Sequence, residues 1–498
     1  MKKSLKRAAA ASAVCAVSLA GTLATNPTAV AGEAAEARAS QKPITDFGMK
    51  ALAFGTKVSV NGVDIKSLKD SLNIQACTRT AGLERAKTSN LEPGQYLPIP
   101  DDLVRVSPST SSTQTYRDGA VTGTRAINTI ADIRVGGEVV EDLKIPTLKI
   151  EGLRAIADSF HDPADADGDG NPFGTAESFD FKGISLDYEG TVVEGTPLAD
   201  LLDIVNDVTA PVNETVSELV TLLTDQVGQI IEIPGLGSIG LGNSFSKIDA
   251  ASATSGANAL KIEVDPTEQS NDSVTLLKLG YAQSRIADSK PSGVFRSTIM
   301  GLDFEALPLT DDVSVLHMGG IGTESIPCEG TDNKKIVKTI EGERAIPLNI
   351  PGLGGVAVLD GLEYSYKAKQ MSRGRARSMA KSSLASFTIP VLDLEITGVS
   401  SKLNLLSRKG ERVRGSKNPK FKVADILYKG ESLIPEGGLK IGQSVEFAID
   451  ELQQKGFITY GPRFSRNYYG SKLSALSVDI PGIVSLDLGW LESQIYPR

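Results

Sequence analysis

Apolar and polar residues alternate one by one along much of the chain, in runs of five to thirteen residues. Residues 258–264, 274–286, 474–480 and 484–495 are the clearest examples. Period-two alternation is typical of a β-strand with one buried face, because successive side chains point to opposite sides of a sheet. Clusters of glycine, asparagine, aspartate and serine separate the runs, as turns do. The pattern predicts a mainly β fold of antiparallel sheets.

Two of these strand pairs resemble each other residue by residue. Residues 258–264 and 274–286 match residues 474–480 and 484–495 in their apolar positions, and a glycine followed by an aromatic residue stands at the same place in both. Self-similarity in a fixed order indicates an internal repeat. We therefore expect two similar halves of antiparallel sheet that arose by tandem duplication.

Weaker matches keep the same order and extend the repeat backwards. Residues 145–151 resemble residues 389–395, and the segment that begins at Phe181 resembles the one that begins at Phe421. A turn-forming stretch at residues 290–293 separates the halves. The expected division is a signal peptide (1–31), a linker (32–44), a first β-rich half (45–290) and a second β-rich half (291–498).

Two segments carry apolar residues at helical spacing, one in each half. In the first, Thr196 is a suitable N-cap for a leucine and valine stripe that runs from residue 198 to residue 227. In the second, four apolar residues share one helical face: Ile441, Val445, Ile449 and Leu452. We therefore expect a few amphipathic helices against the sheets, in an α+β arrangement.

The N-terminus has the features of a secretory signal. Four cations precede an apolar run at residues 8–23, and Ala29-Val30-Ala31 supplies a cleavage site before Gly32. No later stretch is apolar for long enough to span a bilayer. We expect an extracellular protein, secreted or held non-covalently at the cell surface.

Two cysteines, Cys77 and Cys328, remain after cleavage at that site. In an oxidising compartment two cysteines favour one disulfide bond. Two separate thiols, one in each half, are the alternative.

Charge is unevenly distributed along the 498 residues. The formal net charge of −9 and the pI of about 5.1 argue against nucleic acid as a partner of the whole chain. Residues 373–422, in contrast, are rich in lysine and arginine on both sides of an uncharged strand candidate at residues 384–391. This region would form an electropositive face for an anionic cell-wall polymer or for lipid headgroups. A solvated face that balances the acidic first half is the alternative.

One acidic segment has the spacing of a calcium loop, with carboxylates at alternate positions before a glycine. A stretch at residues 153–160, which we interpret as helical, precedes it as in an EF-hand, but the twelfth position is Ala176 and the acid follows one residue late. A solvated acidic turn explains the same residues, and Ca²⁺ is the one cofactor that the sequence suggests. The candidate ligands are Asp165, Asp167, Asp169, Asn171 and Glu177.

Catalytic motifs are missing from the sequence. His161 and His317 are the only histidines, and neither accompanies a G-x-S-x-G motif of the kind that carries a catalytic serine. The sequence also lacks a P-loop and a dinucleotide-binding fingerprint. We therefore predict a protein without enzymatic activity.

The chain resembles the secreted actinobacterial proteins grouped as choice-of-anchor families, most nearly the P type. The signal peptide, the strand end at Gly280-Tyr281-Ala282 and the run from Asp118 to Thr124 that leads to Val135-Gly136-Gly137 carry the resemblance. It implies an exported β-rich body, and the chain departs from the family plan in having no evident C-terminal anchor. We expect a structural or binding protein of a Gram-positive, actinobacterial envelope. An extracellular carrier of lipid or another apolar ligand is the alternative, and a secreted hydrolase ranks third.

Overall fold

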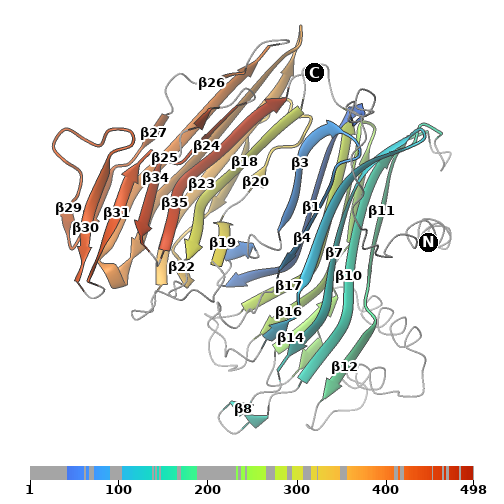
Figure 1. The fold of residues 1–498 in the computed structure, drawn as a ribbon, viewed down its shortest axis with the longest axis horizontal. Coiled ribbons are helices and arrows are strands. Elements are labelled where there is room, and N and C mark those ends of the chain that lie inside the picture. Colours follow the sequence, from blue (N-terminus) through green and yellow to red (C-terminus); the bar gives the residue numbers. More distant parts are fainter. Residues whose placement is uncertain are drawn as a thin grey trace, which may run out of the picture. The chain divides into compact units, whose positions relative to one another are not determined.

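The chain forms four large antiparallel sheets, two before residue 290 and two after it (Figure 1). The computed structural model describes residues 42–60, 63–66, 72–89, 104–136, 139–140, 143–144, 147–164, 170–187, 231–233, 237–241, 244–264, 275–288, 294–306, 316–321, 324–347, 356–408, 413–415, 420–450, 453–461, 465–466, 470–481 and 484–496. The predicted signal peptide and the predicted helix at residues 196–227 lie outside these residues.

Sheets 1 and 2 belong to the first half of the chain. Sheet 1 has the order β13 (Ile231–Ile233), β14 (Gly237–Leu241), β16 (Ser252–Val264), β17 (Thr275–Asp288), β1 (Ile44–Val60) and β2 (Val63–Lys66), with β15 (Ser244–Asp249) on β16 and β3 (Asn73–Thr80) on β1. Sheet 2 has the order β11 (Phe173–Asp180), β10 (Thr147–His161), β7 (Val121–Val135), β6 (Ser109–Asp118) and β4 (Glu84–Ser89), with β12 (Gly183–Asp187) on β10 and β5 (Val104–Val106) on β7. A short hairpin joins β8 (Val139–Val140) to β9 (Leu143–Lys144).

Sheets 3 and 4 belong to the second half. Sheet 3 has the order β19 (Leu316–Ile321), β18 (Val294–Ala306), β35 (Val484–Tyr496), β34 (Leu476–Ile480), β31 (Gln454–Tyr460) and β30 (Ser444–Ile449), with β20 (Glu324–Ser325) on β18, β33 (Gly470–Leu473) on β35 and β32 (Ser465–Arg466) on β33. Sheet 4 has the order β21 (Ile336–Ile340), β23 (Val356–Met371), β24 (Arg375–Ile389), β25 (Leu394–Ser407), β28 (Asp425–Tyr428) and β29 (Glu431–Ser432), with β22 (Arg344–Pro347) on β23 and with β26 (Arg414–Gly415) and β27 (Lys420–Lys422) on β25.

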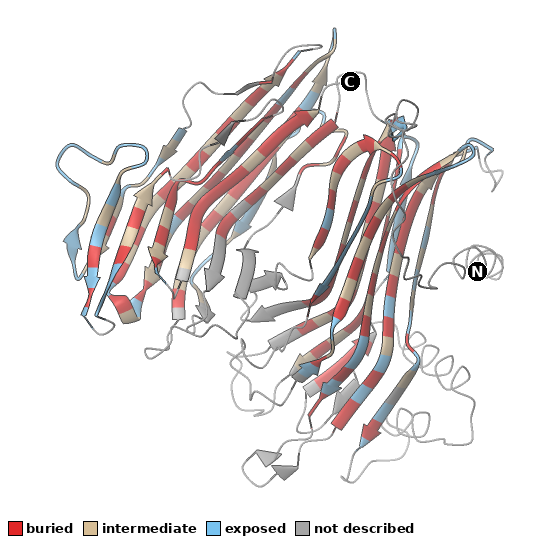
Figure 2. Ribbon diagram, viewed as in Figure 1, coloured by how far each residue is buried: buried red, intermediate tan, exposed pale blue. Residues whose placement is uncertain are grey.

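Buried residues alternate with partly buried or exposed residues along the long strands, as the period-two pattern predicts (Figure 2). The core is built from aliphatic residues, and buried serines bridge facing sheets. In the first half Ser159 of sheet 2 contacts Ser284 of sheet 1 at 2.8 Å between hydroxyl oxygens, and in the second half Ser378 of sheet 4 contacts Ser493 of sheet 3 at 3.0 Å. The mainly β prediction is confirmed.

Glycines at positive φ mark points where the buried positions of a strand shift by one residue; we call these points bulges, although the neighbouring strand shifts as well and the cross-strand register is the same on both sides. In β25 the inward residues Ile396 and Val399 are three positions apart, and Gly398 between them takes a φ of +61°. A residue in this left-handed region at a bulge is most easily glycine. The bulge thus restores the alternation beyond it.

The same bulge occurs in the first half. In β10, Gly152 has a φ of +65° and is left unpaired opposite Ala131 of β7, as Gly398 is left unpaired opposite Ala385 of β24. Counting from these bulges gives equivalent positions in sheets 2 and 4. This alignment of Gly152 with Gly398 is shifted by two residues from the sequence match of residues 145–151 with residues 389–395.

The strongest sequence repeat also has one register in both halves. Leu260 pairs with Leu279 beside Gly280, and Leu476 pairs with Leu488 beside Gly489. Both glycines have positive φ, +67° and +65°. The two strand pairs therefore share register and bulge position as well as sequence.

The helix predicted around Ile441–Leu452 is wrong, because residues 444–449 form β30. Phe447 and Ile449 are buried at a spacing of two, and the helical interpretation had left Phe447 out. Phe447 lies over Gly456, its direct partner on β31, where a Cβ atom would come within 2.2 Å of the ring. The cross-strand pair therefore decides the local structure.

Residues 153–160, which we interpreted as helical, belong to β10. In the described part of the chain the helical positions are the 3₁₀ turn η3 (Pro390–Leu392) and the single residue Asp450. The few amphipathic helices that the sequence suggested are therefore not found among the described residues.

One disulfide bond joins Cys77 on β3 to Cys328, with 5.4 Å between the Cα atoms and 251 residues between them in sequence. Both cysteines are buried. Glu329, which follows Cys328 in sequence, forms an ion pair with Arg285. The predicted disulfide is confirmed, and it links the two halves.

Candidate functional site

Lysine and arginine side chains cover one face of sheet 4. Cross-strand partners include Lys369 with Arg377, Lys381 with Lys402, and Lys402 with Lys420. Partners lie on the same side of a sheet, and every second residue along a strand joins them. We name this surface the cationic face; its residues are Lys367, Lys369, Arg375, Arg377, Lys381, Lys402, Lys420 and Lys422.

The cationic face points away from the core. The residues between its members along the strands, such as Ala368, Ala380 and Leu403, are fully buried on the opposite side of the sheet. Lys369, Arg377, Lys420 and Lys422 are exposed, and the Lys381 side chain is 41% exposed. The charged groups therefore meet solvent and any partner that approaches this face.

Acidic side chains on the same side lie toward one end of the strands. Glu363 approaches Lys381 at 4.0 Å, and Asp360 and Glu395 lie beyond the bulge at Gly398. Rows further from the bulge carry cations opposite cations, as Lys369 and Arg377 do. The charge is therefore separated along the strand direction.

Like charges directly opposite each other destabilise a sheet, because adjacent strands are only about 4.8 Å apart. The row Lys381, Lys402 and Lys420 contains two such contacts and the pair Lys369–Arg377 a third. These pairings of like charge are not an arrangement that stabilises a sheet.

On the face of sheet 2 that points away from the core, the positions equivalent to the cationic face carry no row of cations. Its residues there are apolar, small or internally neutralised. Counted from the bulges, the equivalent positions are Ile127 for Lys381, Ile156 for Lys402, Gly123 for Arg377 and Tyr116 for Lys369. The cations of sheet 4 are therefore not a requirement of this architecture.

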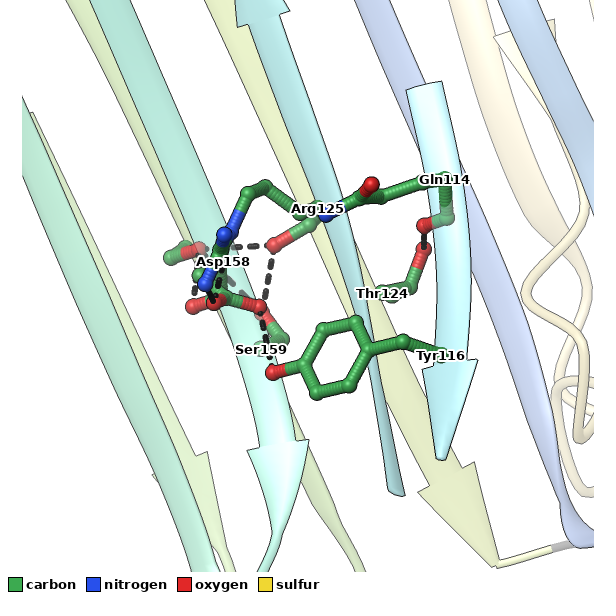
Figure 3. A network of polar contacts seen from close by, with 8 residues as sticks. Gln114, Tyr116, Thr124, Arg125, Asp158 and Ser159 are labelled. Carbon is green, nitrogen blue, oxygen red and sulfur yellow. Dashed lines mark hydrogen bonds and ion pairs between the residues drawn. The ribbon is translucent and has the colours of Figure 1, made fainter. Parts of the chain in front are cut away.

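On sheet 2 the charges are instead enclosed in a network on neighbouring strands (Figure 3). Arg125 on β7 donates from Nε and Nη2 to one oxygen of Asp158 on β10, at 3.0 and 2.6 Å. Tyr116 on β6 donates to the other oxygen at 2.9 Å. The network ties three strands together.

Burial dominates the electrostatics of this network. Asp158 is 5% exposed, and its desolvation raises the pKa of its carboxyl group, an effect that Arg125 opposes. Burial and the neighbouring carboxylate also raise the pKa of Tyr116. The charged groups of this network are thus hydrogen-bonded to one another in a buried setting.

Hydroxyl groups adjoin the network but lack a general base. Ser255 donates to the carbonyl oxygen of Asp158 at 2.8 Å and lies 2.8 Å from Ser284. His161 packs against the rings of Phe47 and Phe173, with centroids 4.5 and 5.0 Å away. In the interactions described, neither hydroxyl meets an imidazole, which a catalytic serine needs.

Two of the five candidate calcium ligands lie in the described part of the chain. Asn171 donates to the carbonyl of Asp249 at 3.4 Å and accepts from the amide of Phe173 at 3.1 Å. Glu177 lies on β11, four residues beyond Phe173, or about 13 Å along the strand. Its burial raises the pKa of its carboxyl group. The structure does not bring Asn171 and Glu177 together.

The other three candidates, Asp165, Asp167 and Asp169, lie outside the described residues. Within the described residues no three histidine, cysteine or acidic side chains are grouped so as to hold a metal ion. The calcium site remains a prediction from sequence.

Sequence reasoning found the basic region but missed Lys402. This lysine stands between the two basic segments, inside a strand whose other charged residue is Glu395. Only the pairing of β25 with β24 and β27 places it between Lys381 and Lys420. A signal was present, because the alternation of residues 375–389 and 394–407 around a tight connection implies a hairpin.

No helix in the described residues has the length and apolarity needed to cross a lipid bilayer. No protein-family model matches the sequence, and no curated protein matches it either. The resemblance to choice-of-anchor proteins therefore remains a prediction, and the function has to be argued from the cationic face itself.

Proposed function

We propose that this is an exported, non-enzymatic binding protein of a Gram-positive, actinobacterial envelope, which holds an anionic cell-wall polymer on the cationic face of sheet 4. The observation that carries the proposal is the row of Lys381, Lys402 and Lys420 on three adjacent strands. Mutual repulsion in this row is relieved when a polyanion lies along it.

The geometry favours a linear polymer over a lipid surface. Cations recur about every 4.8 Å across the strands and about every 7 Å along them, so a chain of phosphate groups could contact several at once. Insertion into lipid needs exposed apolar side chains beside the cations. Of the large apolar side chains found exposed in the described residues, only Val337 belongs to sheet 4.

Two further observations support the setting of this proposal. A buried disulfide bond is typical of proteins that fold in an oxidising, extracytoplasmic compartment. The matched bulges at Gly152 and Gly398, and at Gly280 and Gly489, favour tandem duplication as the origin of the two halves. We infer that the halves then diverged, and that only sheet 4 carries cations at the positions of the cationic face.

The proposal is tested by binding of a long inorganic polyphosphate to the mature protein over a series of salt concentrations. Replacing Lys381, Lys402 and Lys420 by glutamine should weaken binding at least tenfold. It should also flatten the plot of log affinity against log salt by about 2, because each phosphate contact to a single-stranded polyanion contributes roughly 0.7.

A matched variant controls for net charge. Lys247, Lys261 and Lys455 lie on sheets 1 and 3, and changing all three to glutamine removes the same charge elsewhere. Equal losses in the two triple variants would refute a specific face. Vesicles with phosphatidylglycerol should bind more weakly than the polymer, and the reverse order would favour a lipid surface.

A further inference from the structure

A second row of like charges lies on sheet 2. Arg105 of β5 pairs with Arg134 of β7, and Arg134 pairs with Lys149 of β10. All three side chains are exposed on the side away from the core. The row is separate from the cationic face, which belongs to the other half of the chain.

Two carboxylates form the next row on the same side. Asp132 pairs with Glu151, one step of two residues from Arg134 and Lys149. Ser107 donates to Asp132 at 3.4 Å. Cations and acids are therefore about 7 Å apart along the strands.

The two rows enclose a depression of about 210 Å³. The side chains of Ile133 and Ile150 are buried in the core, so these residues offer backbone as its floor. Gly152, with its positive φ, follows Glu151 at the edge of this depression. Pockets for drug-sized ligands measure roughly 300–1,000 Å³, so this one suits a single small unit and not a polymer.

Sheet 4 shows that the fold does not require the charged row. The equivalent residues, counted from the bulges, are Val358, Thr388 and Glu395, which pair with one another in the same way. They include no cation. As on the cationic face, like charges on three adjacent strands are unfavourable for the sheet, and a bound anion would offset their repulsion.

We propose that this depression is a binding site for a small phosphorylated polyol. The phosphate group lies on the row of Arg105, Arg134 and Lys149, and hydroxyl groups donate to Asp132 and Glu151. The two carboxylates repel a bare anion but accept hydrogen bonds from an anion that carries hydroxyl groups. They therefore determine the specificity for a phosphorylated polyol over phosphate. The site does not depend on the function proposed for the cationic face.

Calorimetric titration of the mature protein with glycerol 3-phosphate tests the site, with inorganic phosphate and glycerol as the comparison ligands. Glycerol 3-phosphate should bind at least tenfold more tightly than either. R134Q/K149Q should lose at least tenfold in affinity for it, while K381Q/K402Q/K420Q should keep wild-type affinity.

Neutralising Asp132 and Glu151 should have the opposite effect on the binding of inorganic phosphate. D132N/E151Q should bind inorganic phosphate more tightly than wild type and should lose the preference for glycerol 3-phosphate. Circular dichroism identifies any variant that fails to fold, and the two double variants check each other. Equal binding of glycerol 3-phosphate and phosphate by wild type, or unchanged binding in folded R134Q/K149Q, would overturn the proposal.

Discussion

At the scale of single residues, Arg125 and Asp158 show how a charged pair can be enclosed in one half and absent from the other. The equivalent residues of sheet 4, counted from the bulges, are Met379 and Asn404, which are direct partners on β24 and β25. The same site therefore accepts an ion pair or a neutral pair.

Replacing Arg125 by methionine should destabilise the protein by about 3 kcal/mol at neutral pH, because it leaves a buried carboxylate without its cation. R125M/D158N, which copies the neutral pair of sheet 4, should recover most of that loss. Urea unfolding of the two variants measures the difference. Equal destabilisation in both would show that the charge is not the cause.

The pH dependence of these variants has a definite sign. Burial raises the pKa of Asp158, so the folded protein takes up this proton at a higher pH than the unfolded chain does. The contribution of this group to stability is therefore greatest in acid and is lost as pH rises through the folded-state pKa. R125M removes the opposing charge, so its stability should fall with rising pH more than that of wild type, while R125M/D158N should show no such fall.

At the scale of the strand, bulges with glycine at positive φ determine which residues face the core. Gly398 at a bulge can be compared with Gly430 in the turn between β28 and β29; their φ values are +61° and +80°. A Cβ atom at Gly398 would lie 2.6 Å from the Cβ of Ala424, whereas at Gly430 it would meet nothing within 4 Å. An alanine would strain the backbone at both positions, but only at Gly398 would its Cβ atom also clash with a neighbouring residue.

Gly430→Ala should therefore cost about 1 kcal/mol and Gly398→Ala about 1–2 kcal/mol more, measured as the free energy of unfolding in urea. Adding Ala424→Gly to Gly398→Ala should recover the steric part. If the two single variants lost equal stability, the close packing at the bulge would be refuted.

Strands were more predictable than helices for a physical reason. Period-two alternation is local, so residues 394–407 revealed their strand directly. Ile441, Val445 and Ile449 fit a spacing of four as well as a spacing of two, and only the partner strand β31 decides between them. The site depends on register in the same way: Lys402 meets Lys381 and Lys420, and Asp158 meets Arg125, only after pairing.

At the scale of the whole molecule, the bond between Cys77 and Cys328 connects the halves across 251 residues of sequence. A cross-link over so long a loop restricts the unfolded chain strongly, by roughly 5 kcal/mol in the chain-entropy model. Two cysteines in a chain that the sequence predicts to be exported made this bond predictable without knowledge of the fold.

Reduction of the disulfide should lower the unfolding temperature of the wild-type protein. C77S/C328S should unfold at the reduced protein's temperature and should not respond to reductant, as followed by circular dichroism during heating. A wild-type protein that is unaffected by complete reduction, verified by thiol labelling, would mean that the bond does not stabilise the assembly of the two halves.

The central claim is that the cationic face of sheet 4 carries the polymer, and lysine footprinting tests it most directly without any mutation. The protein is acetylated with and without long-chain polyphosphate, and mass spectrometry measures the rate at each lysine. We predict strong protection of Lys381, Lys402 and Lys420 and unchanged rates at Lys247, Lys261 and Lys455. Protection spread evenly over all six, or confined to the last three, would contradict the claim.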